Sequence, residues 1–252
     1  MQLDRIEAIV RPRNSWESID LGFSMMQRWW QPLYKVWFSL MLPFFFLLTL
    51  LFHDALWIAA LLIWWLKPCY DRIILHFLSH ALFGEQPNIW QTLTALPKLS
   101  KSRVLLALSF GRFDFARSFN LSVAQLENLR GKAASQRIRL LQKSTRNTAV
   151  WLTIVCLHFE LVLYLSLFGL TFLMLPVAHD FDFFTSVFYG ETFWVDFLNV
   201  FFGFIGLSII EPLYVAGGFA LYLNRRTHLE GWDIELMFRQ IETKLNSSEK
   251  SK

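Results

Sequence analysis

The chain has 252 residues, of which 54% are hydrophobic, 17% aromatic and only 17% charged, with a formal net charge of +4. An average soluble domain carries roughly a quarter of charged residues. The composition excludes a disordered chain, a collagen-like chain and an ordinary soluble enzyme, and it indicates an integral membrane protein. The first residues are polar and no cleavage-site pattern follows them, so we expect the first apolar segment to act as the insertion signal.

The N-terminal segment, residues 1–35, predicts an amphipathic helix at the membrane interface. Asn14 or Ser15 can cap the start of this helix through a side-chain oxygen. One face of the helix carries the apolar residues Trp16, Ile19, Phe23 and Met26.

Two apolar runs follow, at 36–52 and 55–66, with two polar residues between them. At about 1.5 Å per residue the first run is just long enough to cross a bilayer, whereas the second, about 18 Å long, is too short alone. Either the second helix continues past Pro68, or the Lys67 ammonium extends to the membrane surface. We predict a tight helical hairpin with an amphipathic, interfacial extension over 36–84.

The segment 85–148 is strongly basic, with eleven Lys or Arg and two acidic residues between 98 and 146. Ser122 predicts the start of a helix that runs to about residue 143 and has an apolar line between basic positions. These positions are Arg130, Lys132, Arg137, Arg139 and Lys143. Two interpretations stay open: attachment to anionic inner-leaflet lipid, or docking onto a cytoplasmic protein. No nucleic-acid recognition motif accompanies the charge, so we expect no nucleic-acid partner.

The third and fourth apolar runs, at 149–175 and 193–223, predict a second transmembrane hairpin over 149–223. The loop between them, 176–192, has three acidic residues and no Lys or Arg. Because cations collect on the cytoplasmic side, this loop is predicted outside and the basic segment inside. Residues 224–252 then form a cytoplasmic amphipathic helix and a tail. The predicted fold class is an all-α membrane protein with about four transmembrane helices in two hairpins, interfacial amphipathic helices, and both termini inside.

Six polar side chains fall within or beside the apolar runs, where burial in lipid is costly: Lys67, His158, Glu160, Asp196, Glu211 and Tyr214. A tetrapeptide with proline second and tyrosine fourth recurs at 31–34, 67–70 and 211–214. This recurrence favours a diverged duplication, in which Lys67 and Glu211 are equivalent and pair with each other. The alternative leaves Lys67 at the surface by itself. The carboxylates either form a proton- or ion-coupled path or hydrogen-bond neighbouring helices for structural reasons.

Recognisable catalytic chemistry is missing from the sequence. It contains no nucleophile motif, no phosphate-binding loop and no paired CxxC. His76 and His80 are four residues apart, but no glutamate lies between them, so we expect no metal site. We expect no cofactor and no enzymatic activity.

Several short motifs extend over nearly the whole chain. They stand at 11–13 (RPR), 16–17 (WE), 19–23 (IDLGF), 65–68 (WLKP), 82–85 (LFGE), 123 (V), 125–127 (QLE), 211–215 (EPLYV), 221–227 (LYLNRRT) and 231–236 (GWDIEL). Together they resemble a family of bacterial inner-membrane proteins without an established activity. Members often continue into a C-terminal domain of unknown function, which we expect this chain to lack. Their genes tend to neighbour those for a MoxR-type AAA ATPase, a von Willebrand A-like protein, a SpoIIM-like membrane protein and an RDD-type membrane protein.

Two functions follow from these observations. The resemblance implies a non-enzymatic scaffold or accessory subunit in the inner membrane, with the lipid bilayer, an AAA ATPase and a von Willebrand A-like protein as partners in an envelope system. The alternative is a transporter or channel subunit that uses the intramembrane carboxylates. Four helices are few for a transporter, so this alternative includes a homo-oligomer.

Overall fold

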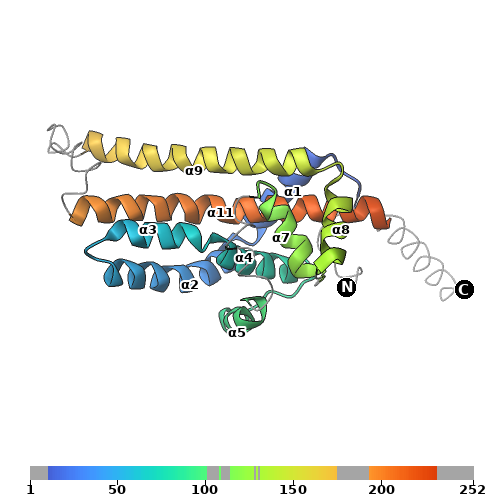
Figure 1. Ribbon diagram of the computed structural model, residues 1–252, viewed down its shortest axis with the longest axis horizontal. Coiled ribbons are helices and arrows are strands. Elements are labelled where there is room, and N and C mark those ends of the chain that lie inside the picture. The colour runs from blue at the N-terminus through green and yellow to red at the C-terminus, as the bar shows by residue number, and fades with distance from the viewer. Residues whose placement is uncertain are drawn as a thin grey trace, which may run out of the picture.

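The computed structural model describes residues 11–100, 108, 114–127, 129, 131–174 and 193–231. Within these ranges every regular element is a helix, as Figure 1 shows. The helices are α1 (Ser15–Arg28), α2 (Trp30–Leu51), α3 (Leu56–Trp65), α4 (Lys67–Ala81), α5 (Ile89–Ser100), α7 (Arg117–Leu126), α8 (Gly131–Gln142), α9 (Arg146–Met174) and α11 (Phe193–Glu230). Helices satisfy their own backbone hydrogen bonds, which a chain surrounded by lipid requires.

Three of these helices, α2, α9 and α11, are long and apolar enough to cross a membrane. The chain is therefore a multi-pass membrane protein by the length and composition of its helices. The second apolar run forms α3, which has 10 residues and is about 15 Å long. That length is about half of the roughly 30 Å hydrocarbon core.

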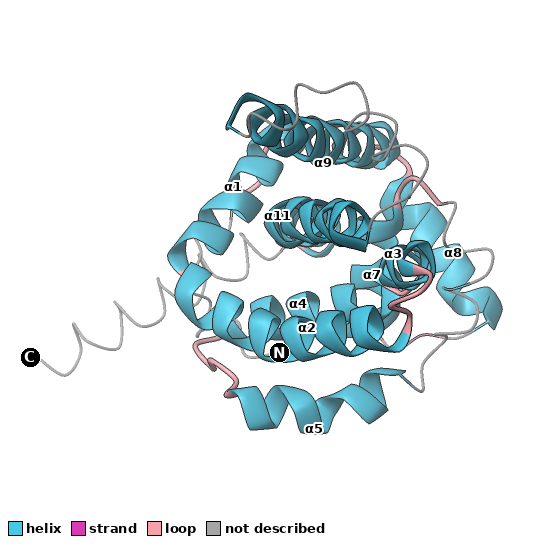
Figure 2. Ribbon diagram, turned by 90° about the vertical axis from the view of Figure 1, so that its left-hand side faces the viewer, coloured by secondary structure: helices cyan, strands magenta, loops and turns pink. Residues whose placement is uncertain are grey.

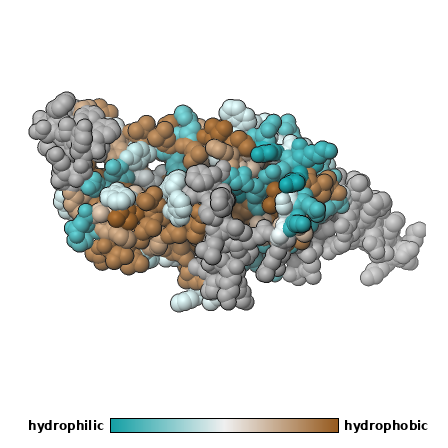
Figure 3. All heavy atoms as spheres, viewed as in Figure 1, coloured by the Kyte–Doolittle hydropathy of each residue, from teal (hydrophilic) through white to brown (hydrophobic). Residues whose placement is uncertain are grey.

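Helix α11 lies at the centre of the bundle. It packs against α1, α3, α4, α7, α8 and α9, and its residues around Val215 and Ala220 are fully buried. Figures 1 and 2 show α9 on one side of α11 and α2, α3 and α4 on the other. In Figure 3 apolar residues cover the end formed by α2, α3 and the adjoining part of α9, while hydrophilic residues gather at the opposite end, near α7 and α8. The bundle thus has an apolar end and a polar end.

The first and last described helices are in direct contact. A Cβ atom on Gly22 of α1 would lie 2.5 Å from the carbonyl oxygen of Ala216 on α11, so only glycine allows this approach. Just before α1, the Arg13 backbone N–H donates to Asn224 Oδ1 at 2.9 Å, and Asn224 Nδ2 donates back to the Arg13 carbonyl at 2.9 Å. The N-terminal helix is therefore part of the core of the protein.

The capping and the apolar face predicted for α1 can be compared with the structure, whereas its place at the membrane interface stays a prediction. Asn14 caps the helix, as predicted, by accepting a hydrogen bond from the Trp16 N–H at 3.5 Å. The predicted apolar face is partly wrong, because Trp16 is 52% exposed while Ile19 and Met26 are buried. The buried residues lie on the side of α1 that packs against α11.

The helix formed by the second apolar run ends at a break at Leu66. Pro68 stands in the first turn of α4, where its missing N–H costs nothing. The Tyr70 hydroxyl donates to the Ile63 carbonyl at 2.8 Å and so joins α4 to α3 across the break. The Lys67 side chain is 4% exposed. The interpretation that Lys67 extends to the membrane surface is therefore wrong.

The basic segment contains two helices where one was predicted. Helix α7 begins at Arg117 and ends at Leu126, and Ser122 lies inside it, where its hydroxyl donates to the Ser118 carbonyl at 3.2 Å. Helix α8 starts at Gly131, whose φ of 59° lies in the left-handed region that glycine tolerates. The predicted cap at Ser122 is wrong. Arg117 packs into the core, and the helix begins there, before Ser122.

The boundary predicted between residues 223 and 224 falls inside α11, which continues to Glu230. The polar residues that follow 223 therefore extend the fourth apolar helix rather than begin a separate one. The loop 176–192 and most of the predicted C-terminal helix and tail lie outside the described residues.

Candidate functional site

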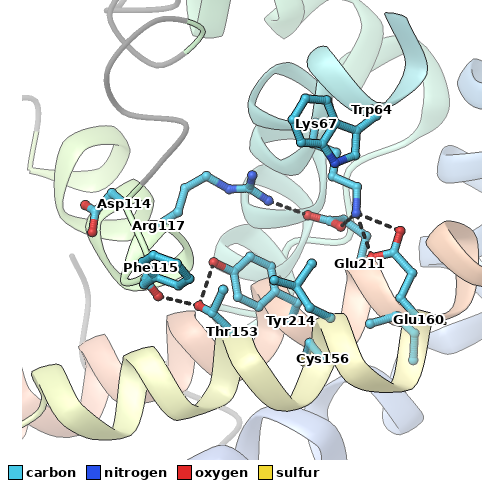
Figure 4. Close-up of a pocket in the computed structure, with 12 residues that line it drawn as sticks. Trp64, Lys67, Asp114, Phe115, Arg117, Thr153, Cys156, Glu160, Glu211 and Tyr214 are labelled. Carbon is cyan, nitrogen blue, oxygen red and sulfur yellow. Dashed lines mark hydrogen bonds and ion pairs between the residues drawn. The ribbon is translucent and has the colours of Figure 1, made fainter. Parts of the chain in front are cut away.

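Five charged side chains from four helices meet near the middle of α11. We call Lys67, Asp71, Arg117, Glu160 and Glu211 the buried charged cluster. Lys67 Nζ lies 2.8 Å from Glu160 Oε2 and 3.0 Å from Glu211 Oε2. Arg117 Nη2 lies 2.8 Å from Glu211 Oε1 and 3.1 Å from Asp71 Oδ2. Figure 4 shows Glu211 between the two cations.

Local structure explains how these residues come together. The break at Leu66 places Lys67 in the first turn of α4, and Asp71 follows one turn later on the same face. Glu160 lies 14 residues before the end of α9, or about 21 Å, and Glu211 lies 18 residues after the start of α11, or about 27 Å. The cluster therefore lies toward the polar end of the apolar part of the bundle.

The cluster holds three carboxyl groups and two cations. Asp71 is 1% exposed, and neither of its oxygens has a hydrogen bond of good geometry to any described residue. Burial, followed by the neighbouring Glu211 carboxylate, raises the pKa of the Asp71 carboxyl well above its usual range, although Arg117 acts in the opposite direction. Asp71 is therefore the member best placed to keep a proton at neutral pH.

Tyr214 holds Arg117 in position. Its ring lies 5.4 Å from the Arg117 guanidinium carbon, and its hydroxyl accepts a hydrogen bond from the Ser118 backbone N–H at 3.1 Å. The same hydroxyl shares a hydrogen bond with the Thr153 hydroxyl at 3.2 Å. Tyr214 thereby connects α11 to α7 and α9 beside the cluster.

Two cavities meet at Glu160. The inner cavity, of about 190 Å³, extends from Glu160 toward Asp114 at the polar end. The outer cavity, of about 340 Å³, extends from Glu160 toward Asp196 near the start of α11. Both cavities are lined by Glu160 and Trp64, and Tyr164 donates a hydrogen bond to Asn199 in the wall of the outer one. A single carboxylate thus borders two cavities whose walls are mainly apolar.

The structure brings together only part of the predicted intramembrane set. Lys67, Glu160 and Glu211 are in direct contact, and Tyr214 adjoins them. Asp196 lies in the wall of the outer cavity and outside the cluster. His158 is exposed on α9 and takes no part in it.

Two members of the cluster were not predicted. Asp71 follows Lys67 by four residues, a spacing that places both side chains on one face of a helix. Arg117 had no comparable signal, because its partners on α4 and α11 are distant in sequence and it resembled the other basic residues of its segment.

The basic residues predicted to form one surface fall into ion-paired and exposed side chains. Arg137 Nε lies 2.7 Å from Glu127 Oε2 and its Nη2 contacts Glu230, so this side chain joins α8 to α11 rather than facing a partner. The hydrogen bonds that Arg137 donates to Glu127 raise the pKa of Arg137 above its ordinary value. Lys132, Arg139 and Lys143 are exposed. Arg130 lies outside the described residues.

His76 and His80 lie one turn apart on α4. Over the described ranges, no three His, Cys, Asp or Glu side chains are arranged to hold a metal ion. The rings of His76 and His80 lie 4.2 Å apart between centroids. Burial, followed by the His80 neighbour, lowers the pKa of His76 to about 4.

Comparisons with protein-family models, with curated proteins and with solved structures found no match to this chain. The family resemblance of the sequence motifs therefore stays a prediction, and function has to be inferred from the geometry of the site.

Proposed function

We propose that this chain is a subunit of a proton-coupled transporter or channel in the bacterial inner membrane, with Glu160 as the residue that binds and releases the proton. The observation that carries the proposal is the position of Glu160 between two cavities that extend toward opposite ends of the bundle. An ionisable residue within a membrane-spanning helix is a functional candidate by default, because its burial there is costly.

The proposed topology has four crossings, with both termini in the cytoplasm. The three long apolar helices support three of them. The fourth combines α3 with the first turn of α4, which together extend about 22 Å from Leu56 to Tyr70. The basic residues between 98 and 146 favour the cytoplasm for the polar end. Only 11% of the most apolar stretch of α9 is buried, so the rest of that surface can contact lipid or a second copy of the chain.

In the proposed mechanism, protons reach Glu160 through the outer cavity, whose wall holds Asp196 and Asn199. Lys67 stabilises the Glu160 carboxylate when it is ionised. When Glu160 takes a proton, the Lys67 ammonium retains Glu211 as its partner at 3.0 Å. The cluster therefore keeps its cation paired in both protonation states of Glu160, which limits the cost of the change inside the membrane.

The test is a proton-flux measurement on purified protein in liposomes that contain a pH-sensitive dye, under a potassium-diffusion potential. Glu160→Gln should reduce the flux by about tenfold or more, because the amide cannot exchange a proton. Glu85→Gln, on an exposed residue outside the cluster, is the matched control. Wild-type flux equal to that of empty liposomes, or unchanged flux in the Glu160 variant, would refute the proposal.

A scaffold for a cytoplasmic AAA ATPase and von Willebrand A-type system is the second candidate. The exposed cations Lys132, Arg139 and Lys143 favour it. The first two lie on α8 and Lys143 directly follows it, and Arg137 connects α8 to α11 through Glu230. A mild-detergent pull-down from the host, with mass spectrometry, should recover such proteins with the wild type and lose them when these three cations are changed to alanine. Recovery that is equal for both proteins would remove this candidate.

A further inference from the structure

The inner cavity combines acidic and aromatic side chains in one wall. Its three acidic residues, Asp114, Glu160 and Glu211, outnumber its two cations. Its aromatic residues are Trp64, Phe115 and Tyr214, and Figure 4 shows Phe115 and Tyr214 near α9 and Trp64 beside Lys67. Carboxylates together with aromatic faces are the chemistry that recognises organic cations.

The charges of the two cations are directed into the protein. Lys67 is 4% exposed and is occupied by Glu160 and Glu211, while Arg117 lies between Glu211 and Asp71. The Glu160 side chain is 21% exposed, the largest exposed fraction among the ion-paired members of the cluster. The charge that a ligand in the cavity meets most directly is therefore the negative charge of Glu160.

The mouth of the cavity lies on the apolar side of the protein. Trp64 is 44% exposed and Leu157 is 48% exposed, and both belong to helices whose outer surfaces are apolar. Phe115, 55% exposed, lies at the end toward α7. A ligand with an apolar part can therefore enter from the lipid side while its charged part meets Glu160.

We propose that the inner cavity binds a small amphiphilic organic cation, such as a quaternary or protonated amine carrying an apolar group, with its nitrogen at Glu160 and against the Trp64 ring. This inference names the substrate class of the proposed transport and rests on that proposed function. Cation and proton compete for one carboxylate, so binding of one releases the other. Together with exposure of the site to the two sides of the membrane in turn, this competition would couple the movement of the two ions in opposite directions.

The test uses benzyltrimethylammonium as the probe and its neutral isostere neopentylbenzene as the matched ligand control. Binding to the purified full chain in detergent is followed by titration calorimetry. Glu160→Gln should weaken benzyltrimethylammonium binding by about tenfold or more, because the charge partner is lost. Trp64→Leu should weaken it by about fivefold through loss of the cation–π contact. Trp57→Leu changes an exposed tryptophan that lines only the outer cavity, and binding should be unchanged.

The outcomes separate this inference from the proposed function. Equal affinity for the charged probe and its neutral isostere overturns the inference, as does undiminished binding by a Glu160→Gln protein that keeps its thermal transition. Proton flux without probe binding leaves the proposed function standing and refutes the organic cation. Probe binding without proton flux supports the site and refutes proton coupling.

Discussion

Two ion-pair networks connect α11 to its neighbours, and the one that contains Glu211 is the more deeply buried. The buried charged cluster joins α11 to α4, α7 and α9 through groups such as Glu211, which is 3% exposed. The surface network, formed by Glu127, Arg137, Arg226 and Glu230, joins α11 to α8 through groups that are 11% to 26% exposed. The ion pairs themselves have similar lengths.

The difference in environment changes what these pairs contribute. Exposed pairs contribute about 0–1 kcal/mol each, because water competes for both charges. A buried pair has already lost its hydration, so removing one partner costs about 3–5 kcal/mol, although an apolar replacement of the whole pair is often harmless. Stability alone does not require a buried charged cluster. Because this cluster also borders two cavities, a functional role for its charges explains it better than a contribution to stability.

The largest expected effect comes from removing the central cation of the cluster. Lys67→Met leaves Glu160 without its cation and removes one of the two cations of Glu211, so the free energy of unfolding should fall by about 3–5 kcal/mol. Tryptophan fluorescence during denaturation in detergent measures this, since the chain has 11 tryptophans. Lys35→Met, on an exposed lysine of α2, should change stability by less than about 0.5 kcal/mol. Equal losses in the two variants would contradict the distinction between the networks.

A smaller effect concerns the pH dependence that Asp71 confers. Its pKa is raised in the folded state, so the folded protein binds this proton more tightly than the unfolded chain does. The associated stability is fully present below the unfolded pKa and is lost as the pH rises through the folded pKa, at up to about 1.4 kcal/mol per pH unit. The groups around Asp71 are Lys67 and Arg72 on its own helix, Arg117 and Glu211.

Asp71→Asn should remove this dependence while preserving the fold at neutral pH, because asparagine resembles the protonated acid. Thermal unfolding across a pH series measures the change. Asp20→Asn, on an exposed residue of α1, provides the control. A pH profile that Asp71→Asn leaves unaltered would show that Asp71 is ionised in the folded protein.

The surface network should respond weakly and in a salt-dependent way. Arg137→Ala removes pairs with Glu127 and Glu230 and should lower the free energy of unfolding by about 1 kcal/mol at low salt. Salt at about 1 M should reduce that loss by screening, whereas the effect of Lys67→Met should persist. Lys132→Ala, on the same helix, is the matched control. A salt-independent loss for Arg137→Ala would place this network among the buried ones.

The smallest expected effect belongs to His76. Its pKa is about 4 in the folded protein, below the ordinary 6.5, so the folded state favours the neutral ring and stability declines as the pH falls from 6.5 toward 4. The ring is only partly buried, and solvent screening limits the loss to about 0.5 kcal/mol. His76→Gln should remove this acid-side decline, measured by thermal unfolding, and His158→Gln, on an exposed residue, should retain it. Identical pH profiles for the two variants would argue against the role of His76.

Hydrophobic context was sufficient to predict three members of the cluster. Glu160 and Glu211 stood out as carboxylates inside apolar runs, and the repeated tetrapeptide suggested that Lys67 pairs with Glu211, which lies 3.0 Å away. The additional Lys67–Glu160 pair was not predicted, because the relative rotation of α9 and α4 is determined by packing on α11. Long apolar runs predict helices reliably, but they do not determine which faces of two helices pack against each other.

The polar end of the protein was harder to predict. Asp71 and Arg117 looked like solvent-facing charges, because an amphipathic pattern cannot distinguish a face toward water from a face toward other charges. Ser122 carried a good cap signal, yet it lies inside α7 because burial of Arg117 and Ser118 against α11 starts the helix earlier. The left-handed glycine at 131 was the local signal for the break between α7 and α8.

The central position of α11 has a consequence for how the protein is made. Every described helix that packs against α11 precedes it in the chain, so Lys67, Asp71, Arg117 and Glu160 are synthesised before Glu211 exists. Until α11 enters the bundle, both cations of the cluster lack the carboxylate that they share, and the glycine contact with α1 is not yet made. Arrival of α11 therefore completes charge pairing and helix packing in one step.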